Sequence, residues 1–153
     1  MTEPVARDVG GIELPRELYE QMVSHALAGY PNEACGTVAG LDGKAVRVYP
    51  MRNAEESPVV YRFDEREQIQ VFDEIENQGW ELLAFFHSHT HSPAYPSPTD
   101  LAQASWRDPF TGDQVAAYPG TRYLILSLQH DEPVIRAFRF DGGEPVEEDV
   151  RIT

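Results

Sequence analysis

The segment "HSHTHSPAYPSPTD", residues 87–100, holds three of the five histidines in the 153-residue chain, and it ends on the carboxylate of Asp100. It follows an apolar run, 82–86, that is typical of a buried strand. Residues two apart on a strand point to the same face, so His87 and His89 can converge on one ion. Zinc takes imidazole nitrogen and carboxylate oxygen, and a catalytic site keeps one position for water. With Asp100 as the nearest third ligand, the segment predicts a catalytic metal site.

The same residues also have ordinary structural interpretations. "SPTD" predicts a helix start, with Ser97 as the cap, Pro98 at the first position and Asp100 reaching back to the cap. Two histidines at a strand end are about as often surface residues as ligands. Taken together, however, the spacing His-x-His-x7-Ser-x2-Asp should arise by chance in well under ~1 in 1,000 chains of this length. Capping and ligation are also compatible, because a carboxylate has two oxygens.

The spacing from His87 to Asp100 resembles, without a gap, the signature of the JAMM (MPN-plus) metalloprotease family. That family also uses an upstream glutamate, which "PNEACGTVAG" supplies as Glu33. Without the resemblance, Glu33 is better interpreted as a solvated surface acid. The resemblance extends over about 12–140 and is greatest to small bacterial members that process sulfur carriers, including the CysO-cysteine peptidase type. The segments "NEACG", "MRNAEESPVVYRFD" and "AYPSPTD" carry this subgroup likeness.

The resemblance implies a role for each of these residues. His87, His89 and Asp100 would bind one Zn²⁺ ion, with water as the fourth ligand. Glu33 would take the proton of that water and pass it to the departing amine, and Ser97 would donate a hydrogen bond to the oxyanion. Iron or manganese would also suit two histidines and one aspartate.

The partner that the resemblance implies is the C-terminal Gly-Gly tail of a ubiquitin-like sulfur-carrier protein. Cleavage after the last glycine would, for example, release cysteine from a carrier–cysteine adduct. One alternative is a general isopeptidase that removes ubiquitin-like modifiers from lysine. Another is a catalytically inactive scaffold, but such scaffolds usually lack one or more of the ligands. The sequence leaves open whether the chain forms a homodimer.

The elements that must position these residues alternate between helix and strand. The patterns predict helices over 15–28, 64–78 and 97–105, strands over 34–39, 44–51, 59–63, 81–87, 123–128 and 134–140, and an edge strand or extended tail over 146–152. This order predicts a mixed α/β fold, and the resemblance implies the cytidine-deaminase-like MPN fold, a curved mixed sheet flanked by helices. We expect one domain over 1–153, with a loose lead-in over 1–11. The stretch 106–120 is predicted to be an insertion loop, which would form either a lid or substrate rim or a plain surface excursion.

Composition limits the classes of partner. Acids outnumber bases 26 to 12, and the net charge of -14 argues against nucleic acid and anionic membranes as partners. The chain shows neither an apolar run of roughly 20 residues nor a signal-peptide pattern, which predicts a cytoplasmic protein.

Five further side chains are candidates for lesser roles. Cys35, the single cysteine, is expected to be a small buried residue beside the site. His91 is predicted on a loop surface, because a fourth protein ligand would displace the water. Tyr95 is expected either to wall the tail groove or to pack its own loop. His25 and His130 have no partner pattern and are predicted to be surface residues.

Overall fold

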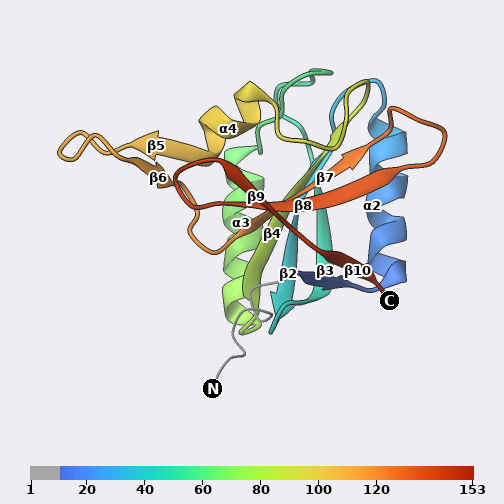
Figure 1. The fold of residues 1–153 in the computed structure, drawn as a ribbon. Coiled ribbons are helices and arrows are strands. Elements are labelled where there is room, and N and C mark those ends of the chain that lie inside the picture. The colour runs from blue at the N-terminus through green and yellow to red at the C-terminus, as the bar shows by residue number, and fades with distance from the viewer. Residues whose placement is uncertain (1–10) are drawn as a thin grey trace.

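The computed structural model describes residues 11–153, so the predicted lead-in lies outside the described part except for Gly11. Helices and strands alternate along these residues, as predicted for a mixed α/β chain (Figure 1). The helices are α2 (Arg16–Gly29), α3 (Glu65–Asn77) and α4 (Pro98–Ala104). The strands are β1 (Ile12–Leu14), β2 (Cys35–Leu41), β3 (Lys44–Met51), β4 (Glu81–His89), β5 (Ser105–Arg107), β6 (Gln114–Ala116), β7 (Arg122–Ser127), β8 (Val134–Phe140), β9 (Pro145–Glu148) and β10 (Val150–Ile152).

One mixed sheet organises the chain, with the strand order β10-β1-β3-β2-β4-β7-β8-β9. The central strands β4 and β7 run parallel, whereas β2 pairs antiparallel with both β3 and β4. Strand β9 lies at one edge and β10 at the other, although only Asp149 separates them in the chain. The sheet therefore curls until its two edges approach each other. The predicted curved mixed sheet flanked by helices is confirmed (Figure 1).

Strand β4 is buried on both faces, as its apolar run predicted. Phe85 packs in a cluster that includes α3 residues, whereas Phe86 packs in a second cluster with α2 residues. The two helices therefore cover opposite faces of the sheet (Figure 1). Side chains alternate along a strand, so His87 points to the same face as Phe85. This face, covered by α3, is the one that carries the site.

Local signals explain why the predicted helices and the first hairpin form where they do. The Asp64 side chain caps α3 by accepting from the backbone N–H of Glu67, and Gly79 follows the helix at φ +75°. Asp42 and Gly43 both have positive φ, which suits the tight turn between β2 and β3. Helices α2 and α3 agree with their predicted ranges to within a residue or so.

The predicted strand 59–63 is wrong. The segment makes only one isolated bridge, between Asn53 and Phe63. The Asn53 amide donates to the carbonyls of Glu33 and Val60, both at 3.0 Å, and its side-chain oxygen accepts from the Arg62 N–H at 3.2 Å. A side chain thus takes up backbone groups that a strand ladder would otherwise use.

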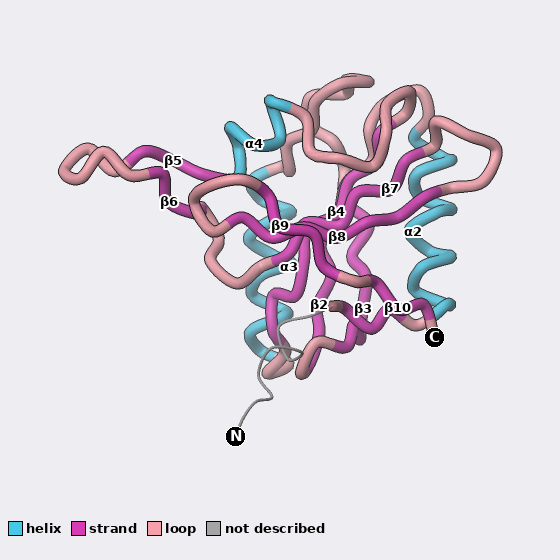
Figure 2. The backbone as a smooth tube through the Cα atoms, viewed as in Figure 1, coloured by secondary structure: helices cyan, strands magenta, loops and turns pink. Residues whose placement is uncertain are grey.

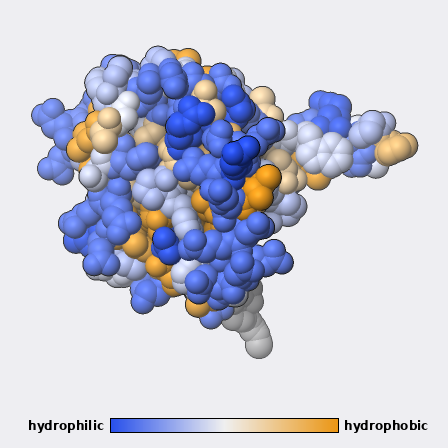
Figure 3. Space-filling model, turned by 180° about the vertical axis from the view of Figure 1, so that it is seen from behind, coloured by the Kyte–Doolittle hydropathy of each residue, from blue (hydrophilic) through white to orange (hydrophobic). Residues whose placement is uncertain are grey.

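The stretch 106–120 is more ordered than predicted. Strands β5 and β6 pair antiparallel, and their hairpin projects well away from the sheet (Figure 2). The Asp108 carboxylate accepts from the backbone N–H of Phe110 at 2.8 Å and helps to form the turn. In the space-filling view the hairpin stands clear of the body, with hydrophobic colour at its far end (Figure 3). The phenylalanine there, Phe110, is 95% exposed.

The C-terminal segment resolves an alternative that the sequence left open. The range 146–152 forms not one edge strand but parts of two, β9 paired with β8 and β10 paired with β1. Strand β1 was not predicted, because three residues are too short to show an alternating pattern. Among the described helices, none is long and apolar enough to cross a membrane.

Candidate metal centre

The end of β4 and the start of α4 bring three predicted ligands together. Strand β4 continues through His89, two residues beyond its predicted end. His87 Nε2, His89 Nε2 and Asp100 Oδ2 are each 3.1 Å from the other two. These side chains form a cluster that could hold a metal ion.

The spacing and chemistry of the three atoms fit a divalent cation. Tetrahedral ligands 2.0–2.1 Å from a zinc ion stand about 3.3 Å apart, close to the separation found here. When both Nε2 atoms are deprotonated, as metal ligation requires, the two nitrogens and the carboxylate oxygen present lone pairs to each other. A cation between them would replace this repulsion with attraction at all three atoms.

The two histidines are oriented in different ways. His89 Nδ1 lies 2.7 Å from the Pro93 carbonyl, which suits an N–H donor there and leaves Nε2 free as a ligand. His87 Nδ1 is buried and has no hydrogen-bond partner among the described residues. Instead, the Tyr61 ring stacks on His87, with centroids 4.6 Å apart and an angle of 23° between the rings. Sequence spacing carried no signal for Tyr61, which lies 26 positions before its partner.

The charges of the cluster are strongly coupled. Burial lowers the pKa of His87. Burial also opposes protonation of His89, but its hydrogen bonds with Asp100 and the Pro93 carbonyl outweigh burial and raise its pKa. Burial would raise the pKa of Asp100, but the hydrogen bonds with both histidines hold it well below its usual range. Asp100 therefore stays a carboxylate throughout the physiological pH range.

Ser97 and Asp100 make the predicted capping box at the start of α4. The Ser97 hydroxyl oxygen accepts from the Asp100 N–H at 3.0 Å, and Asp100 Oδ2 accepts from the Ser97 N–H at 2.9 Å. The capping interpretation is correct, and it coexists with convergence on the histidines. The two roles are not divided between the two carboxylate oxygens, however, because Oδ2 makes both sets of contacts. Because the Ser97 oxygen acts as an acceptor in the cap, its own O–H remains able to donate.

Glu33 lies just before β2, at the same end of the sheet as the cluster. Its side chain is buried, and the carboxylate oxygen Oε1 has no hydrogen-bond partner among the described residues. The next residue, Ala34, donates its N–H to the Ser88 hydroxyl at 2.8 Å, which ties this segment to β4. Burial raises the pKa of Glu33 to about 8, while the charge of His89 lowers it and that of Asp100 raises it. The surface interpretation of Glu33 is therefore wrong.

A cavity of about 390 Å³ opens beside the cluster on the α3 face. His87 and Asp100 form part of its wall, and most of the remaining wall is aromatic. The other lining residues are Tyr61, Arg62, Phe63, Glu65, Gln68, Phe85, Gln103, Tyr118, Tyr123, Ile125 and Phe140. The wall is built from segments far apart in the chain, so no single sequence motif announced it.

The remaining candidates have structural surroundings. Cys35 is fully buried, as expected, and burial raises the pKa of its thiol to about 12. His91 is exposed, and its Nε2 lies 3.0 Å from the Tyr30 hydroxyl, outside the ligand cluster. His130 is exposed, as predicted. The prediction for His25 is wrong, because its half-buried ring approaches the backbone carbonyls of Cys35 and Met51 at 3.0 and 3.1 Å.

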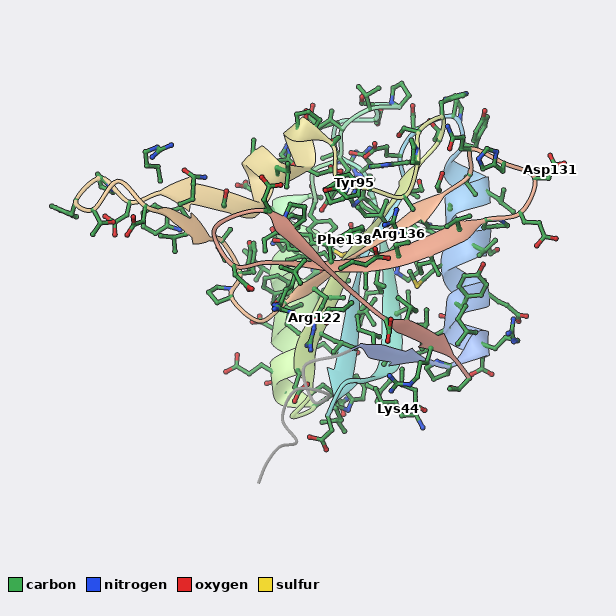
Figure 4. All side chains as sticks on the ribbon, in the orientation of Figure 1. Lys44, Tyr95, Arg122, Asp131, Arg136 and Phe138 are labelled. Atoms are coloured by element: carbon green, nitrogen blue, oxygen red, sulfur yellow. The ribbon has the colours of Figure 1, made fainter. Side chains whose placement is uncertain are left out.

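Tyr95 packs rather than lining the cavity. Its ring meets that of Phe138 edge to face, with centroids 5.4 Å apart. The guanidinium of Arg136 lies 5.9 Å from the centre of the Tyr95 ring, and Figure 4 shows the three side chains together over β8. Of the two predicted roles for Tyr95, packing of the loop is therefore the one observed.

The fold and site agree with the comparison to known proteins. Residues 15–141 match the family of prokaryotic homologues of the JAB domain, and the chain belongs to that family. The CysO-cysteine peptidase of Mycobacterium tuberculosis is 34% identical over 139 residues, which cover 89% of this chain and 87% of that protein. A probable TtuB-protein conjugate cleaving protease of Thermus thermophilus is 38% identical over 114 residues, 74% of each chain. These relatives support a hydrolase of the JAB family.

Solved structures show the same architecture. The protein DSY2949 of Desulfitobacterium hafniense superposes with a TM-score of 0.78 at 33% identity, over 93% of this chain and 92% of that one. A JAB1/MPN domain protein of Archaeoglobus fulgidus, AF2198, superposes with a TM-score of 0.55 at 17% identity, over 91% and 95% of the two chains. The MPN fold implied by the sequence is thereby confirmed.

Proposed function

We propose that the chain is a zinc-dependent peptidase that cuts the amide bond after the C-terminal Gly-Gly of a ubiquitin-like sulfur carrier. In the simplest case it releases cysteine from a carrier–cysteine adduct. The observation that carries this proposal is the convergence of three ligand atoms, 3.1 Å apart, at the same end of the sheet as a buried glutamate whose Oε1 has no hydrogen-bond partner among the described residues. The name of the M. tuberculosis relative supports the same substrate class.

His87, His89 and Asp100 would hold the ion. A bound zinc ion supplies Lewis acidity and lowers the pKa of a water molecule toward neutrality. The protein contributes a dry, pre-shaped position for that chemistry, because both histidines are almost fully buried. The Pro93 carbonyl and the Tyr61 ring keep the two imidazoles in place before any ion arrives.

Glu33 would accept the proton of the attacking water and transfer it to the leaving group. A general base must hold a proton only briefly, so its pKa should lie near the working pH. Burial raises the pKa of Glu33 to about 8 in the metal-free protein, and a positive charge held at the neighbouring ligand cluster would lower it toward the working pH. The unpartnered oxygen of the carboxylate would then accept a proton from water. The same carboxyl group then passes the proton to the departing amine. The leaving group must therefore sit beside Glu33.

Ser97 would stabilise the negative charge that develops on the oxygen of the scissile carbonyl. Its hydroxyl oxygen is held in place by the Asp100 N–H, and its own proton can point toward the oxygen of the scissile carbonyl. Donors fixed before the reaction stabilise a developing oxyanion without a cost of reorganisation. The cap of α4 thus doubles as a positioned donor.

The aromatic cavity would take the carrier's tail. His87 and Asp100 line it, but among its described lining residues Glu33 does not occur. Since the amine leaves on the side of Glu33, the cavity lies on the acyl side of the scissile bond. Glycines at the end of the tail would add no side chains to a cavity that is lined mostly by aromatic rings.

The β5–β6 hairpin would form a rim that grips the carrier. Trp106 is 50% exposed and Phe110 95% exposed, and an exposed aromatic arm is typical of a partner surface. Replacing 107–114 by Asn-Gly would join Trp106 to Val115, which already pair, through a two-residue turn. We expect the Michaelis constant to rise about tenfold, as for loss of one aromatic anchor, with zinc content unchanged. Unchanged kinetics would show that the hairpin is a plain surface excursion.

A direct test uses the CysO carrier for which the M. tuberculosis relative is named, with cysteine attached to its terminal glycine. Mass spectrometry should report loss of one cysteine, and a chelator should abolish that loss until zinc is restored. A purified protein that binds no metal and leaves the adduct intact would favour the inactive scaffold instead.

The second candidate is an isopeptidase that removes a ubiquitin-like modifier from lysine. The name of the T. thermophilus relative, a conjugate-cleaving protease, favours it. Parallel assays with cysteine and lysine adducts of one carrier separate the two functions, because the acyl side is the same and only the leaving group differs.

A further inference from the structure

We propose that Tyr123 is a specificity-determining residue, whose hydroxyl donates a hydrogen bond to a main-chain carbonyl of the bound tail about two residues before the scissile bond. This inference rests on the proposed function and goes beyond it, because it assigns a residue outside the ligand and proton-transfer groups.

The Tyr123 hydroxyl is a buried donor without an acceptor. The side chain is only 8% exposed, and its oxygen has no hydrogen-bond partner in the described part of the chain. Native proteins rarely leave a buried hydroxyl unpaired, because it has lost its hydration without compensation. Tyr123 also lines the cavity beside the cluster, so a ligand in that cavity could supply the missing acceptor.

Neighbouring rings hold the hydroxyl in position. The Phe140 ring meets that of Tyr123 edge to face, with centroids 4.7 Å apart, and the Phe85 ring lies 5.8 Å away. Burial raises the pKa of Tyr123 to about 12, so the group remains a proton donor near neutral pH. The Tyr123 hydroxyl is therefore a fixed donor, and a carbonyl of the bound tail would have to approach it.

The strand register places the backbone of Tyr123 at a defined distance from that of the candidate ligand His87. Tyr123 pairs with Phe85, and Ile125 pairs with His87, on the parallel strands β7 and β4. Tyr123 thus lies two residues before the level of His87, a rise of about 6.6 Å along the sheet. An extended tail covers the same distance in two residues. Because both of these residues are glycines in the proposed substrate, main-chain carbonyls are the acceptors within reach.

The test is Tyr123→Phe, which removes one oxygen and keeps the ring. With the CysO–cysteine adduct as substrate, we expect the Michaelis constant to rise about threefold to tenfold and kcat to stay within about twofold. The affinity of the uncleaved adduct for the Glu33→Gln background should fall by the same factor in calorimetry. The melting temperature of the free protein should stay the same or rise, because an unpaired buried hydroxyl has been removed.

Tyr49→Phe is the matched control. The Tyr49 hydroxyl donates to Glu74 at 2.9 Å and does not line the cavity. We expect this variant to lower the melting temperature and to leave the Michaelis constant unchanged. A purely structural Tyr123 would behave in the same way as this control.

The outcomes separate this inference from the proposed function. If the wild type cleaves the adduct while Tyr123→Phe keeps the same Michaelis constant and affinity, the role of Tyr123 is overturned and the function stands. If the wild type neither binds nor cleaves the adduct, the proposed function is overturned, and the inference with it.

Discussion

Two buried glutamates of this chain have opposite surroundings. Glu33 is 5% exposed and Glu148 is 7% exposed, so the two have lost water to a similar extent. Glu148 accepts from Arg122 at 2.9 Å and from Arg139 at 2.7 Å, and it joins β9 to the two preceding strands. Within residues 11–153, Glu33 pairs with no arginine or lysine, and its Oε1 has no hydrogen-bond partner there.

The difference is the one expected between a structural carboxylate and the general base proposed for Glu33. Two arginines compensate the buried charge of Glu148, which lies close to the point where the sheet curls from β9 to β10. No arginine or lysine among the described residues pairs with Glu33, and burial raises the pKa of its carboxyl group to about 8. A carboxyl group whose pKa is strongly shifted by burial, placed beside a candidate metal centre, is typical of a functional site. Three predictions test the contrast.

The largest effect is expected for Glu33→Gln on catalysis. The amide keeps the shape but cannot carry the proton, so kcat should fall by about 10²- to 10⁴-fold. The free energy of unfolding should stay the same or rise, because a buried, unpaired carboxyl group has been removed. Adduct cleavage and urea unfolding measure the two effects. A variant that is unstable but active would reverse the assignment.

Glu148→Gln should produce the opposite pattern. Removing one partner of a buried ion pair costs about 3–5 kcal/mol, and we expect about 2–3 kcal/mol here because Arg122 and Arg139 are partly exposed. Activity per folded molecule should be unchanged. Urea unfolding at neutral pH measures the loss.

Glu147→Gln is the control for that loss. Glu147 is the adjacent residue and pairs with Arg136 at 2.6 Å, but both side chains are more than a third exposed. Exposed pairs contribute only about 0.2–1 kcal/mol. Equal destabilisation by the two substitutions would show that the buried ion pairs of Glu148 contribute no more to stability than the exposed pair of Glu147.

The smallest effect per step of the experiment is expected in the pH dependence of the metal-free protein, where it is counted per pH unit. Between about pH 4.5 and 8 the folded chain keeps a proton on Glu33 that the unfolded chain releases. The free energy of unfolding should therefore fall as pH rises, by up to about 1.4 kcal/mol per pH unit from this group. Urea titrations of wild type and Glu33→Gln isolate the contribution. Parallel curves for the two proteins would contradict the raised pKa.

Local patterns predicted most of the secondary structure correctly. The capping residues Asp64 and Ser97 act within one turn of the helices that they start, so their signals survive in a short window of sequence. The prediction of a strand over 59–63 was wrong because the side chain of Asn53 forms hydrogen bonds with backbone groups of this segment. The strand propensities of the residues give no sign of such a contact. The hairpin within 106–120 was not predicted for a different reason. Its two strands are only three residues each, which is too short for an alternating pattern to show.

The sequence by itself determined the three ligand candidates and the cap that presents Asp100, because all of them lie within fourteen consecutive residues. It also supported Glu33, but only through resemblance to a family. Only the tertiary structure decided that Tyr61 stacks on His87 and that Glu33 is buried. It also decided that Tyr123 lines the cavity while its hydroxyl has no hydrogen-bond partner among the described residues. The physical reason is distance along the chain: Tyr61 and His87 are 26 positions apart, and burial depends on how the whole sheet curls.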